Sequence, residues 1–374
     1  MHQFTAQGQQ GFKQHQLLAS QSSSQLSSTQ AYQQTTSSSL LSQLKHSASD
    51  SQLSALLDEN SKNSKNSQLA NKSNTSQQSN SQPADKYFNP TEWSVSRFLI
   101  GRPLGSGGFG RVYLAKEKDS GFICVLKSVK KSAIKDANGL KLISREVEIN
   151  SNLNHDNILK MYGYFADALR FYLILEYADT GDLYGYMHKQ PNSRFSEAQA
   201  AEYVKQIIKA IEYLHSKGVI HRDIKPENIL VCNSGQTLKL SDFGWSVKHN
   251  RNANRKTFCG TLDYTPPEML RTKLEGKVNQ YGFAVDLWAI GVLAYELNAG
   301  VAPFFDQNSK NALVKIYKLD LNLPRYFSPQ LKDFLGKVLT RDPHNRLTIP
   351  QMLAHDWITR KGPLQNLKPQ TGFF

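Results

Sequence analysis

The residues best suited to chemistry in this chain lie in two short segments. The first runs from His221 to Asn228 as His-Arg-Asp-Ile-Lys-Pro-Glu-Asn, and the second begins at Asp242 as Asp-Phe-Gly. Asp223 can orient a hydroxyl group and accept its proton, and Lys225 can neutralise a phosphoryl group during transfer. Asn228 and Asp242 can bind Mg²⁺. A chance run of charged residues is the alternative, but the order of the two segments is the one that phosphoryl transfer from ATP to a hydroxyl needs.

A glycine-rich segment and a lysine supply groups that can hold the nucleotide. Gly105–Gly110 lies between two strand candidates, where residues without a Cβ let backbone N–H groups approach phosphate oxygens. A plain hairpin turn is the alternative, and a Rossmann site is disfavoured because a strand rather than a helix follows. Lys127 on the third strand candidate can bridge the α- and β-phosphates. Glu146 is its expected carboxylate partner, with Glu148 as the alternative on another face of the same helix.

Apolar periodicity predicts an α+β protein with two lobes. The first lobe should contain strands at 98–104, 111–117, 123–129, 159–165 and 171–176 and a helix at 140–153. The second should be helical, beginning with the capping box Ser196-Glu-Ala-Gln. The segment from Phe283 to Leu297 is apolar nearly all round, as in a helix buried at the centre of a domain. Together with the two catalytic segments, these features resemble the bilobal protein kinase fold, with an expected N-lobe at 97–176 and an expected C-lobe at 179–358.

The two ends of the chain differ in composition from this folded part. Residues 1–90 are dominated by Gln, Ser and Asn and have too few clustered apolar residues to form a core, so we expect a disordered tail. Residues 359–374 should form a short C-terminal tail. The net charge is +14, and the first 90 residues, with six Lys against three Asp and one Glu, carry only +2, which leaves +12 on the folded part. Surface solvation explains this charge better than an acidic partner, and no basic–aromatic motif specifies nucleic acid.

Cysteine spacing and hydropathy favour an intracellular protein. The three cysteines, Cys124, Cys232 and Cys259, match no zinc-binding spacing, which favours free thiols in a reducing compartment. The longest apolar run, Leu287–Tyr295, is about half as long as a membrane span. The N-terminus contains no signal-peptide core. We therefore expect no disulfide and no membrane anchor.

Arg222 and Thr257 suggest control by phosphorylation. Arg222 directly precedes the expected base and would be unpaired until an anion arrives. Thr257, in the loop after Asp242, follows Arg255 and Lys256, so a basic-directed kinase, including a second copy of this chain, could modify it. We expect a phosphate there to supply the missing anion. An ordinary exposed threonine is the alternative.

Taken together, the motifs resemble those of Aurora-type serine/threonine protein kinases. The resemblance covers about residues 97–358, and Trp245 directly after Asp-Phe-Gly is more specific than general kinase motifs. The other matching segments include Ile100-Gly-Arg-Pro-Leu-Gly105, Arg145-Glu-Val-Glu-Ile149, Tyr162-Gly-Tyr-Phe165, Leu173-Ile-Leu-Glu-Tyr-Ala178, His221 to Asn228, Cys259-Gly-Thr-Leu-Asp-Tyr264 and Pro266-Pro-Glu268. One departure is Val125, where the family usually has alanine. It adds bulk near the adenine without abolishing nucleotide binding.

The resemblance implies roles at individual positions. It makes Leu175 the gatekeeper, residues 176–178 the hinge that binds adenine, and Thr257 the activating phosphosite. It also implies a buried, structural ion pair between Glu268 and Arg346. The cofactors implied are ATP and Mg²⁺. The residues expected to bind them are Leu104, Gly105, Ser106, Gly107, Gly108, Phe109, Gly110, Val112, Lys127, Glu146, Leu175, Glu176, Ala178, Glu227, Asn228 and Asp242, with Asn228 and Asp242 on the metal ion. The expected catalytic residues are Lys127, Asp223 and Lys225.

Substrate preference is a further implication. Lys225 together with Thr261 resembles the serine/threonine-specific pattern, and Trp245 favours serine. Glu227 offers a carboxylate that can bind an arginine two residues before the phosphosite through two parallel hydrogen bonds. Asp182 stands where the family usually has a neutral residue. We expect it to select arginine three residues before the phosphosite.

Kinship also implies a cellular role. Gly163 resembles the spindle-pole Aurora type more than the chromosomal-passenger type. The expected partners are protein substrates with basic residues before the serine or threonine, and a microtubule-associated or passenger-complex activator. We expect the protein to be a monomer. Its expected location is the spindle, centrosome or basal body, in the nucleus or in the cytoplasm. A pseudokinase scaffold is one alternative, which the complete set of expected catalytic residues disfavours. A kinase family with a long C-terminal docking tail is another, and too few residues follow Ile358 for that.

Overall fold

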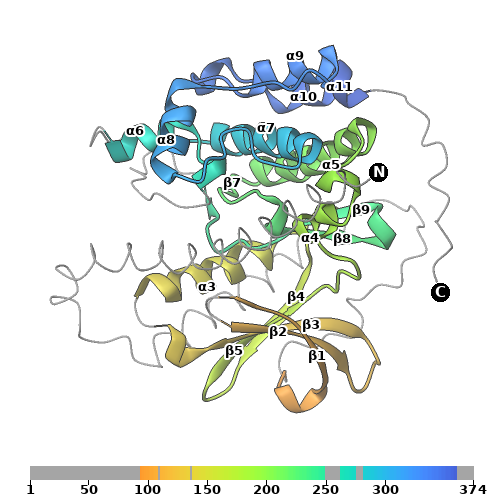
Figure 1. Ribbon diagram of the computed structural model, residues 1–374. Helices are drawn as coiled ribbons and strands as arrows, with labels where there is room; N and C mark the ends of the chain where they lie inside the picture. The colour runs from red at the N-terminus through yellow and green to blue at the C-terminus, as the bar shows by residue number, and fades with distance from the viewer. Residues whose placement is uncertain (1–92, 108–109, 135–136, 249–261, 275–280, 360–374) are drawn as a thin grey trace, which may run out of the picture. The chain divides into compact units, whose positions relative to one another are not determined.

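The computed structural model describes residues 93–107, 110–134, 137–248, 262–274 and 281–359 (Figure 1). The described residues form a β-rich N-lobe and a helical C-lobe, as the sequence predicted. Several predictions fall outside these ranges: the tail at 1–90, Gly108, Phe109, Arg255, Lys256, Thr257, Cys259 and Thr261, and the C-terminal segment after Thr359.

An antiparallel sheet of five strands makes up most of the N-lobe, in the order β1-β2-β3-β5-β4. The strands are β1 (Phe98–Gly107), β2 (Gly110–Glu117), β3 (Ile123–Lys130), β4 (Met161–Ala166) and β5 (Arg170–Leu175). All five were predicted. The pairing of β1 with β2 extends to Gly107 and Gly110, so both strands are longer than the predicted segments 98–104 and 111–117. Gly110 lies so close to β3 that a Cβ there would overlap the carbonyl oxygen of Ser128, which explains why glycine stands at this position.

Stacked aromatic rings cover one face of this sheet. Trp93 stacks on Phe98 with 5.5 Å between ring centroids, Phe98 stacks on Phe165 at 6.0 Å, and Phe165 stacks on Tyr172 at 4.7 Å. A Cβ at Gly163 would lie 3.5 Å from Trp93 Nε1, so the indole packs directly on this glycine. The residues just before β1 therefore belong to the N-lobe core.

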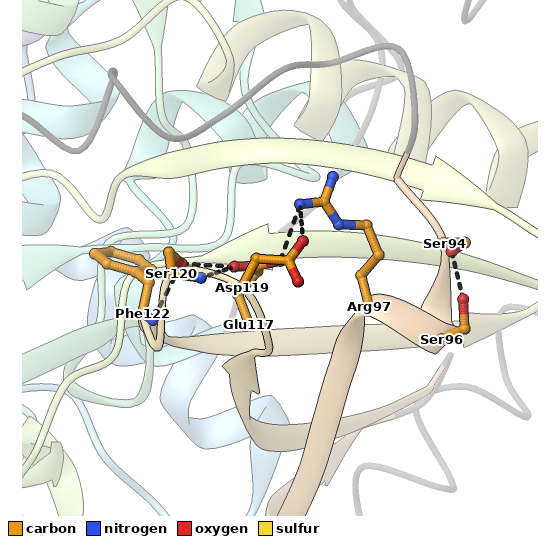
Figure 2. Close-up of polar contacts among 7 residues, drawn as sticks. All are labelled: Ser94, Ser96, Arg97, Glu117, Asp119, Ser120 and Phe122. Carbon is orange, nitrogen blue, oxygen red and sulfur yellow. Dashed lines mark hydrogen bonds and ion pairs between the residues drawn. The ribbon is translucent and has the colours of Figure 1, made fainter.

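A network of hydrogen bonds and ion pairs connects Arg97 to the turn between β2 and β3 (Figure 2). Arg97, at the end of the short 3₁₀ helix η2 (Val95–Arg97), places Nη2 3.0 Å from a carboxylate oxygen of Glu117 and 3.0 Å from one of Asp119. The other Glu117 oxygen accepts bonds from Ser120 N at 2.7 Å and Ser120 Oγ at 2.6 Å. Glu117 is buried, and these donors satisfy it while fixing the turn between β2 and β3.

Helix α3 (Ala137–Asn150) is the long helix of the N-lobe (Figure 1). It begins and ends three residues earlier than the predicted 140–153. Asn152 N bonds to Ile149 O and Leu153 N bonds to Asn150 O, so the chain tightens into turns at the end of the helix. The apolar pattern continued to Leu153 because Leu153 is itself buried.

The C-lobe is built mainly of helices around a long apolar core. They are α4 (Leu183–His188), α5 (Glu197–Ser216), α6 (Pro267–Leu274), α7 (Ala284–Ala299), α8 (Ser309–Lys318), α9 (Pro329–Val338), α10 (Ile349–Ala354) and α11 (Asp356–Thr359). Ser196 Oγ accepts a bond from Gln199 N at 3.3 Å, the first half of the predicted capping box. Nearly every residue of α7 is buried, which confirms the prediction of a central helix. Among the described helices, none is long and apolar enough to cross a bilayer.

Two small sheets complete the C-lobe next to the N-lobe. In one, β6 (Gly181–Asp182), β8 (Ile229–Cys232) and β9 (Thr237–Leu240) lie in the order β6-β8-β9. In the other, β7 (Val219–Ile220) pairs with β10 (Val247–Lys248). These short strands flank the two segments that carry the predicted catalytic groups.

The predicted Glu268–Arg346 ion pair is confirmed. The Arg346 nitrogens Nη1 and Nη2 each lie 2.7 Å from a different carboxylate oxygen of Glu268, in the two-bond geometry typical of arginine. The Arg346 side chain is 0% exposed and also donates to the carbonyl oxygens of Ala284 and Thr340. Through these bonds Arg346 connects α6, the start of α7 and the segment before α10.

Candidate active site

An ion pair joins the sheet to helix α3. Lys127 Nζ on β3 lies 2.6 Å from Glu146 Oε1 and 2.9 Å from Oε2. Burial lowers the pKa of Lys127, but the carboxylates of Glu146 and Asp242 more than compensate, so the pKa is raised and the ammonium stays charged. The alternative partner, Glu148, faces another direction and lies 2.5 Å from Lys248. The structure therefore selects Glu146 as the partner of Lys127.

A buried carboxylate in α7 holds the backbone of the first catalytic segment. Asp286 accepts from the backbone N–H groups of His221 and Arg222, each at 2.9 Å, and contacts His215 Nε2 at 2.9 Å. Although burial raises the pKa of Asp286, the bond and charge of His215 outweigh it, so the pKa is lowered. Arg222 has φ +71°, a left-handed conformation that is costly for a side chain other than glycine. The two bonds from Asp286 stabilise that conformation.

Asp223, Lys225 and Asn228 lie together immediately after this anchor. Asn228 Nδ2 donates to the carbonyl oxygen of Asp223 at 2.8 Å and to Asp223 Oδ2 at 2.7 Å, and Lys225 Nζ lies 3.1 Å from the same Oδ2. Because both bonds of Asn228 use the amide nitrogen, its oxygen Oδ1 is the atom that can bind a metal ion. The three side chains that the sequence grouped are thus neighbours in space.

The second segment packs between the first segment and helix α3. Phe243 is fully buried and meets the ring of His221 edge to face at 5.1 Å. Asp242 has φ +61°, and its Oδ1 accepts from Gly244 N at 3.3 Å. Burial raises the pKa of Asp242, but the Lys127 cation and the Gly244 N–H outweigh it, so the pKa lies below its usual value and the group is ionised near neutral pH.

One carboxylate and one amide oxygen are suitable ligands for Mg²⁺. Magnesium usually takes one or two carboxylates from a protein and completes its shell with phosphate oxygens and water. Asp242 and Asn228 fit that requirement. Within the described ranges no group of three or more His, Cys, Asp or Glu side chains is arranged to hold a metal ion by itself. Asp242 and Asn228 could hold a Mg²⁺ ion whose remaining ligands are phosphate oxygens and water.

Apolar side chains from both lobes form one cluster next to Lys127. Leu104 and Val112 pack with Val125 and the predicted gatekeeper Leu175. Val125 pairs with Leu175 across the β3–β5 ladder. Leu230 of β8 joins the same cluster from the C-lobe side. A flat ring such as a purine suits this arrangement, and Val125 adds the bulk that the sequence predicted.

The side chain of Glu176 in the hinge segment is bonded to residues outside the apolar cluster. Glu176 Oε1 lies 2.9 Å from Lys239 Nζ on β9, and Oε2 accepts from Lys160 N at 3.1 Å. The carboxylate of Glu176 is thus engaged in joining the lobes. The Glu176 N–H already donates to the carbonyl oxygen of Lys160 at 2.9 Å, so residues 176–178 can offer an adenine the Glu176 carbonyl and the backbone groups of Tyr177 and Ala178.

Two of the predicted substrate-binding carboxylates lie close enough to influence each other. Asp182 Oδ1 accepts from Gly185 N at 2.7 Å and so caps helix α4. The exposed Glu227 has a raised pKa, mainly from partial desolvation, with the negative charges of Asp223 and Asp182 adding to the effect. The cap occupies one oxygen of Asp182 and leaves Oδ2 available for a cation.

Two further acids, which the sequence analysis did not select, extend this negative region. Glu296 of α7 accepts a bond of 2.6 Å from Tyr264 OH. Burial, with added repulsion from Glu227 and Asp263, raises the pKa of Glu296 to about 7. Burial and the charge of Glu227 likewise raise the pKa of Asp263 to about 6. A bound guanidinium would stabilise the ionised forms of Glu227, Asp263 and Glu296.

One expectation about Arg222 is wrong. The sequence suggested that this side chain would lack a partner until an anion arrived. In the structure Arg222 Nε donates to Trp245 O at 2.7 Å, and Nη1 donates to Tyr281 OH at 2.8 Å. Neutral acceptors therefore hold the guanidinium in place. Thr257, its expected phosphorylated partner, lies outside the described residues.

The residues that were missed left recognisable signals. Ile229 and Val231 are fully buried in the C-lobe core, so Leu230 between them must face the other side of β8, toward the apolar cluster next to Lys127. Asp286 and Glu296 are the two acids of a mainly apolar helix, and a buried charge needs partners. Asp286 accepts from the backbone of the first catalytic segment, and Glu296 accepts from Tyr264 OH.

Comparison with known proteins agrees with this geometry. The family model for the protein kinase domain matches residues 98–358. Protein kinases are also the class of protein that the two lobes and the paired catalytic segments define. The chain is 48% identical over 270 residues to an Aurora kinase of Schizosaccharomyces pombe, covering 72% of this chain and 73% of that protein. It is 45% identical over 274 residues to Aurora kinase A-A of Xenopus laevis (73% and 65% covered) and 44% identical over 270 residues to Aurora kinase B of Mus musculus (72% and 75%). The chain belongs to the Aurora family of serine/threonine protein kinases.

Proposed function

We propose that the polar groups described above divide the phosphoryl transfer among themselves. Lys127, held by Glu146, binds the α- and β-phosphates, and Asp223 orients the substrate hydroxyl and accepts its proton. Lys225, 3.1 Å from Asp223, stabilises charge on the transferred group. The observation that carries this proposal is the convergence of the Lys127–Glu146 pair, the Asp223 group and the ionised Asp242 from three distant parts of the chain.

The nucleotide is proposed to bind against the apolar cluster next to Lys127. Leu104, Val112, Val125, Leu175 and Leu230 enclose the adenine, and backbone groups of residues 176–178 bind its edge. Glycines of the segment 105–110 approach the phosphates. Asn228 Oδ1 and the carboxylate of Asp242 bind Mg²⁺, which supplies positive charge to the phosphate oxygens when bound.

The acidic region is proposed to select substrates with arginine before the phosphosite. Glu227 and Glu296 would bind an arginine two residues before the serine, and Asp263 adds to their charge. Asp182 would use Oδ2 for an arginine three residues before it. A guanidinium matches a carboxylate with two parallel bonds, which lysine cannot provide.

A peptide kinase assay tests both parts. Wild-type protein with Mg-ATP should phosphorylate a serine peptide with arginine at positions −2 and −3, while Asp242→Asn and Lys127→Met should lose at least about a hundredfold in kcat/KM, the scale of lost electrostatic stabilisation. Equal phosphate incorporation by wild type and Asp242→Asn would reveal a contaminating kinase. If alanine at −2 did not raise the KM, the proposed role of Glu227 and Glu296 would be wrong.

The cellular assignment follows from the family and is also a proposal. We propose that the chain acts in mitosis, at the spindle, centrosome or basal body, as a monomer that receives a microtubule-associated or passenger-complex activator. Gly163 favours the microtubule-associated type, although the A-A and B relatives are matched at nearly equal identity, 45% and 44%. Phosphorylation of Thr257 is proposed to raise activity. Imaging of a tagged copy through division tests the location, and unchanged activity after phosphatase treatment would argue against a role for Thr257.

A further inference from the structure

Helix α3 carries two carboxylates that face in different directions. Glu146 and Glu148 are two residues apart, which at 100° per residue places them on nearly opposite sides of a helix. Glu146 is 6% exposed and pairs with Lys127. The Glu148 side chain is 41% exposed, and its Oε1 lies 2.5 Å from Lys248 Nζ, whose side chain is 65% exposed. The helix is thus bonded to β3 on one side and to β10 on the other.

Strand β10 is tied to both catalytic segments. Lys248 pairs with Val219 and Val247 pairs with Ile220, so β10 is bonded to the residues immediately before His221. In the sequence β10 follows Asp242 and Gly244 by only a few residues. A Cβ at Gly244 would lie 4.0 Å from the carbonyl oxygen of Leu142 in α3, so this segment also packs near the helix. The backbone of Lys248 is therefore held in place by its pairing with β7, next to the first catalytic segment. From that position its charged side chain attracts Glu148 on α3.

We propose that Lys248 is a positioning residue, whose ion pair with Glu148 fastens helix α3 to strand β10 and so keeps Glu146 within reach of Lys127. Among the contacts of the described residues, neither Lys248 nor Glu148 touches Lys127, Asp223 or Asp242. They act through the position of the helix. The inference rests on the role proposed above for the Lys127–Glu146 pair.

The expected effect is small and has a distinct pattern. An exposed ion pair shifts a conformational equilibrium by about two- to fivefold. Lys248→Glu, which replaces attraction to Glu148 by repulsion, should therefore lower kcat/KM for ATP about two- to fivefold. The KM for the peptide should not change, because the acidic substrate region lies on other elements. The melting temperature should stay within about 2 °C, since exposed charges contribute little to global stability.

Charge reversal is the decisive experiment. Glu148→Lys alone should match the loss of Lys248→Glu, and the double variant Lys248→Glu/Glu148→Lys should recover most of the activity, because the pair is restored with opposite sign. Lys248→Arg should keep wild-type activity. In 0.5 M NaCl the Debye length falls to about 4 Å, and the differences among variants should shrink. The assays use the full chain with a serine peptide and a range of ATP concentrations.

A matched control comes from helix α9. Lys337 and Asp333 form a similarly exposed pair, with side chains 52% and 51% exposed and 2.7 Å between Nζ and Oδ2. Lys337→Glu should leave the kinetics unchanged. Wild-type kinetics for Lys248→Glu, or a double variant whose losses simply add, would overturn the inference. Full activity of Lys127→Met is a different result and would overturn the proposed catalytic role instead.

Discussion

Replacing Glu268 by glutamine should destabilise the protein far more than its small change in shape suggests. Glutamine keeps the size of the side chain but removes the charge, and its amide NH₂ then faces an arginine nitrogen that also donates. Arg346 is left as a fully buried cation whose acceptors are all neutral, namely the remaining oxygen of the glutamine and the carbonyl oxygens of Ala284 and Thr340. Breaking a buried ion pair in this way costs about 3–5 kcal/mol. A domain of this size loses about 2–4 °C in melting temperature per kcal/mol, so Glu268→Gln should melt about 6–20 °C lower.

Thermal unfolding followed by circular dichroism measures this effect. Asp333→Asn on helix α9 is the control: its carboxylate also contacts two partners, Lys337 and His355, but it is 51% exposed, so the melting temperature should fall by less than about 2 °C. The two variants make the same chemical change in different surroundings. If Glu268→Gln lost no more than Asp333→Asn, burial of the pair would not be what makes it strong.

Three further outcomes are expected. The KM for a peptide with arginine at −2 should fall as the pH rises from 6 to 8. The carboxyl groups of Glu296 and Asp263, whose pKa values are raised to about 7 and about 6, must ionise to bind the arginine. A peptide with alanine at −2 should show no such trend. Asp182→Thr should remove the preference for arginine at −3 on a peptide array while keeping the helix cap, since threonine also caps helices. Val125→Ala should lower stability by about 1.5–2 kcal/mol through the loss of two methyl groups, while a titration with ATP should show less than about a threefold change in KM.

The elements of the fold could be predicted because local patterns determine them. Short β-type segments located all five N-lobe strands, and the mainly apolar α7 was recognisable as a central helix. The ends were less predictable. Leu153 extended the helical pattern because tertiary packing buries it, although the backbone has already left the helix.

The catalytic groups were predictable where a motif places them next to each other in sequence, as at Asp223 and Asn228. Glu146 was preferred to Glu148, which the sequence placed on another face of the same helix, and the structure confirms that only Glu146 pairs with Lys127. Asp263 and Glu296 were missed because they come together only when the segment before α6 packs on α7. Arg222 was misjudged because its acceptors, a carbonyl group and a phenol, carry no charge that a sequence pattern would reveal.

The distribution of tryptophan gives each lobe its own fluorescent reporter. Of the four tryptophans in the chain, Trp93 stacks on Phe98 beside the sheet. Trp288 and Trp357 are fully buried, next to Phe304 and Phe334 in the helical core. Subtracting the emission of a Trp93→Phe variant from that of the wild type isolates the sheet signal. Fluorescence can therefore show whether the two lobes melt together or one after the other.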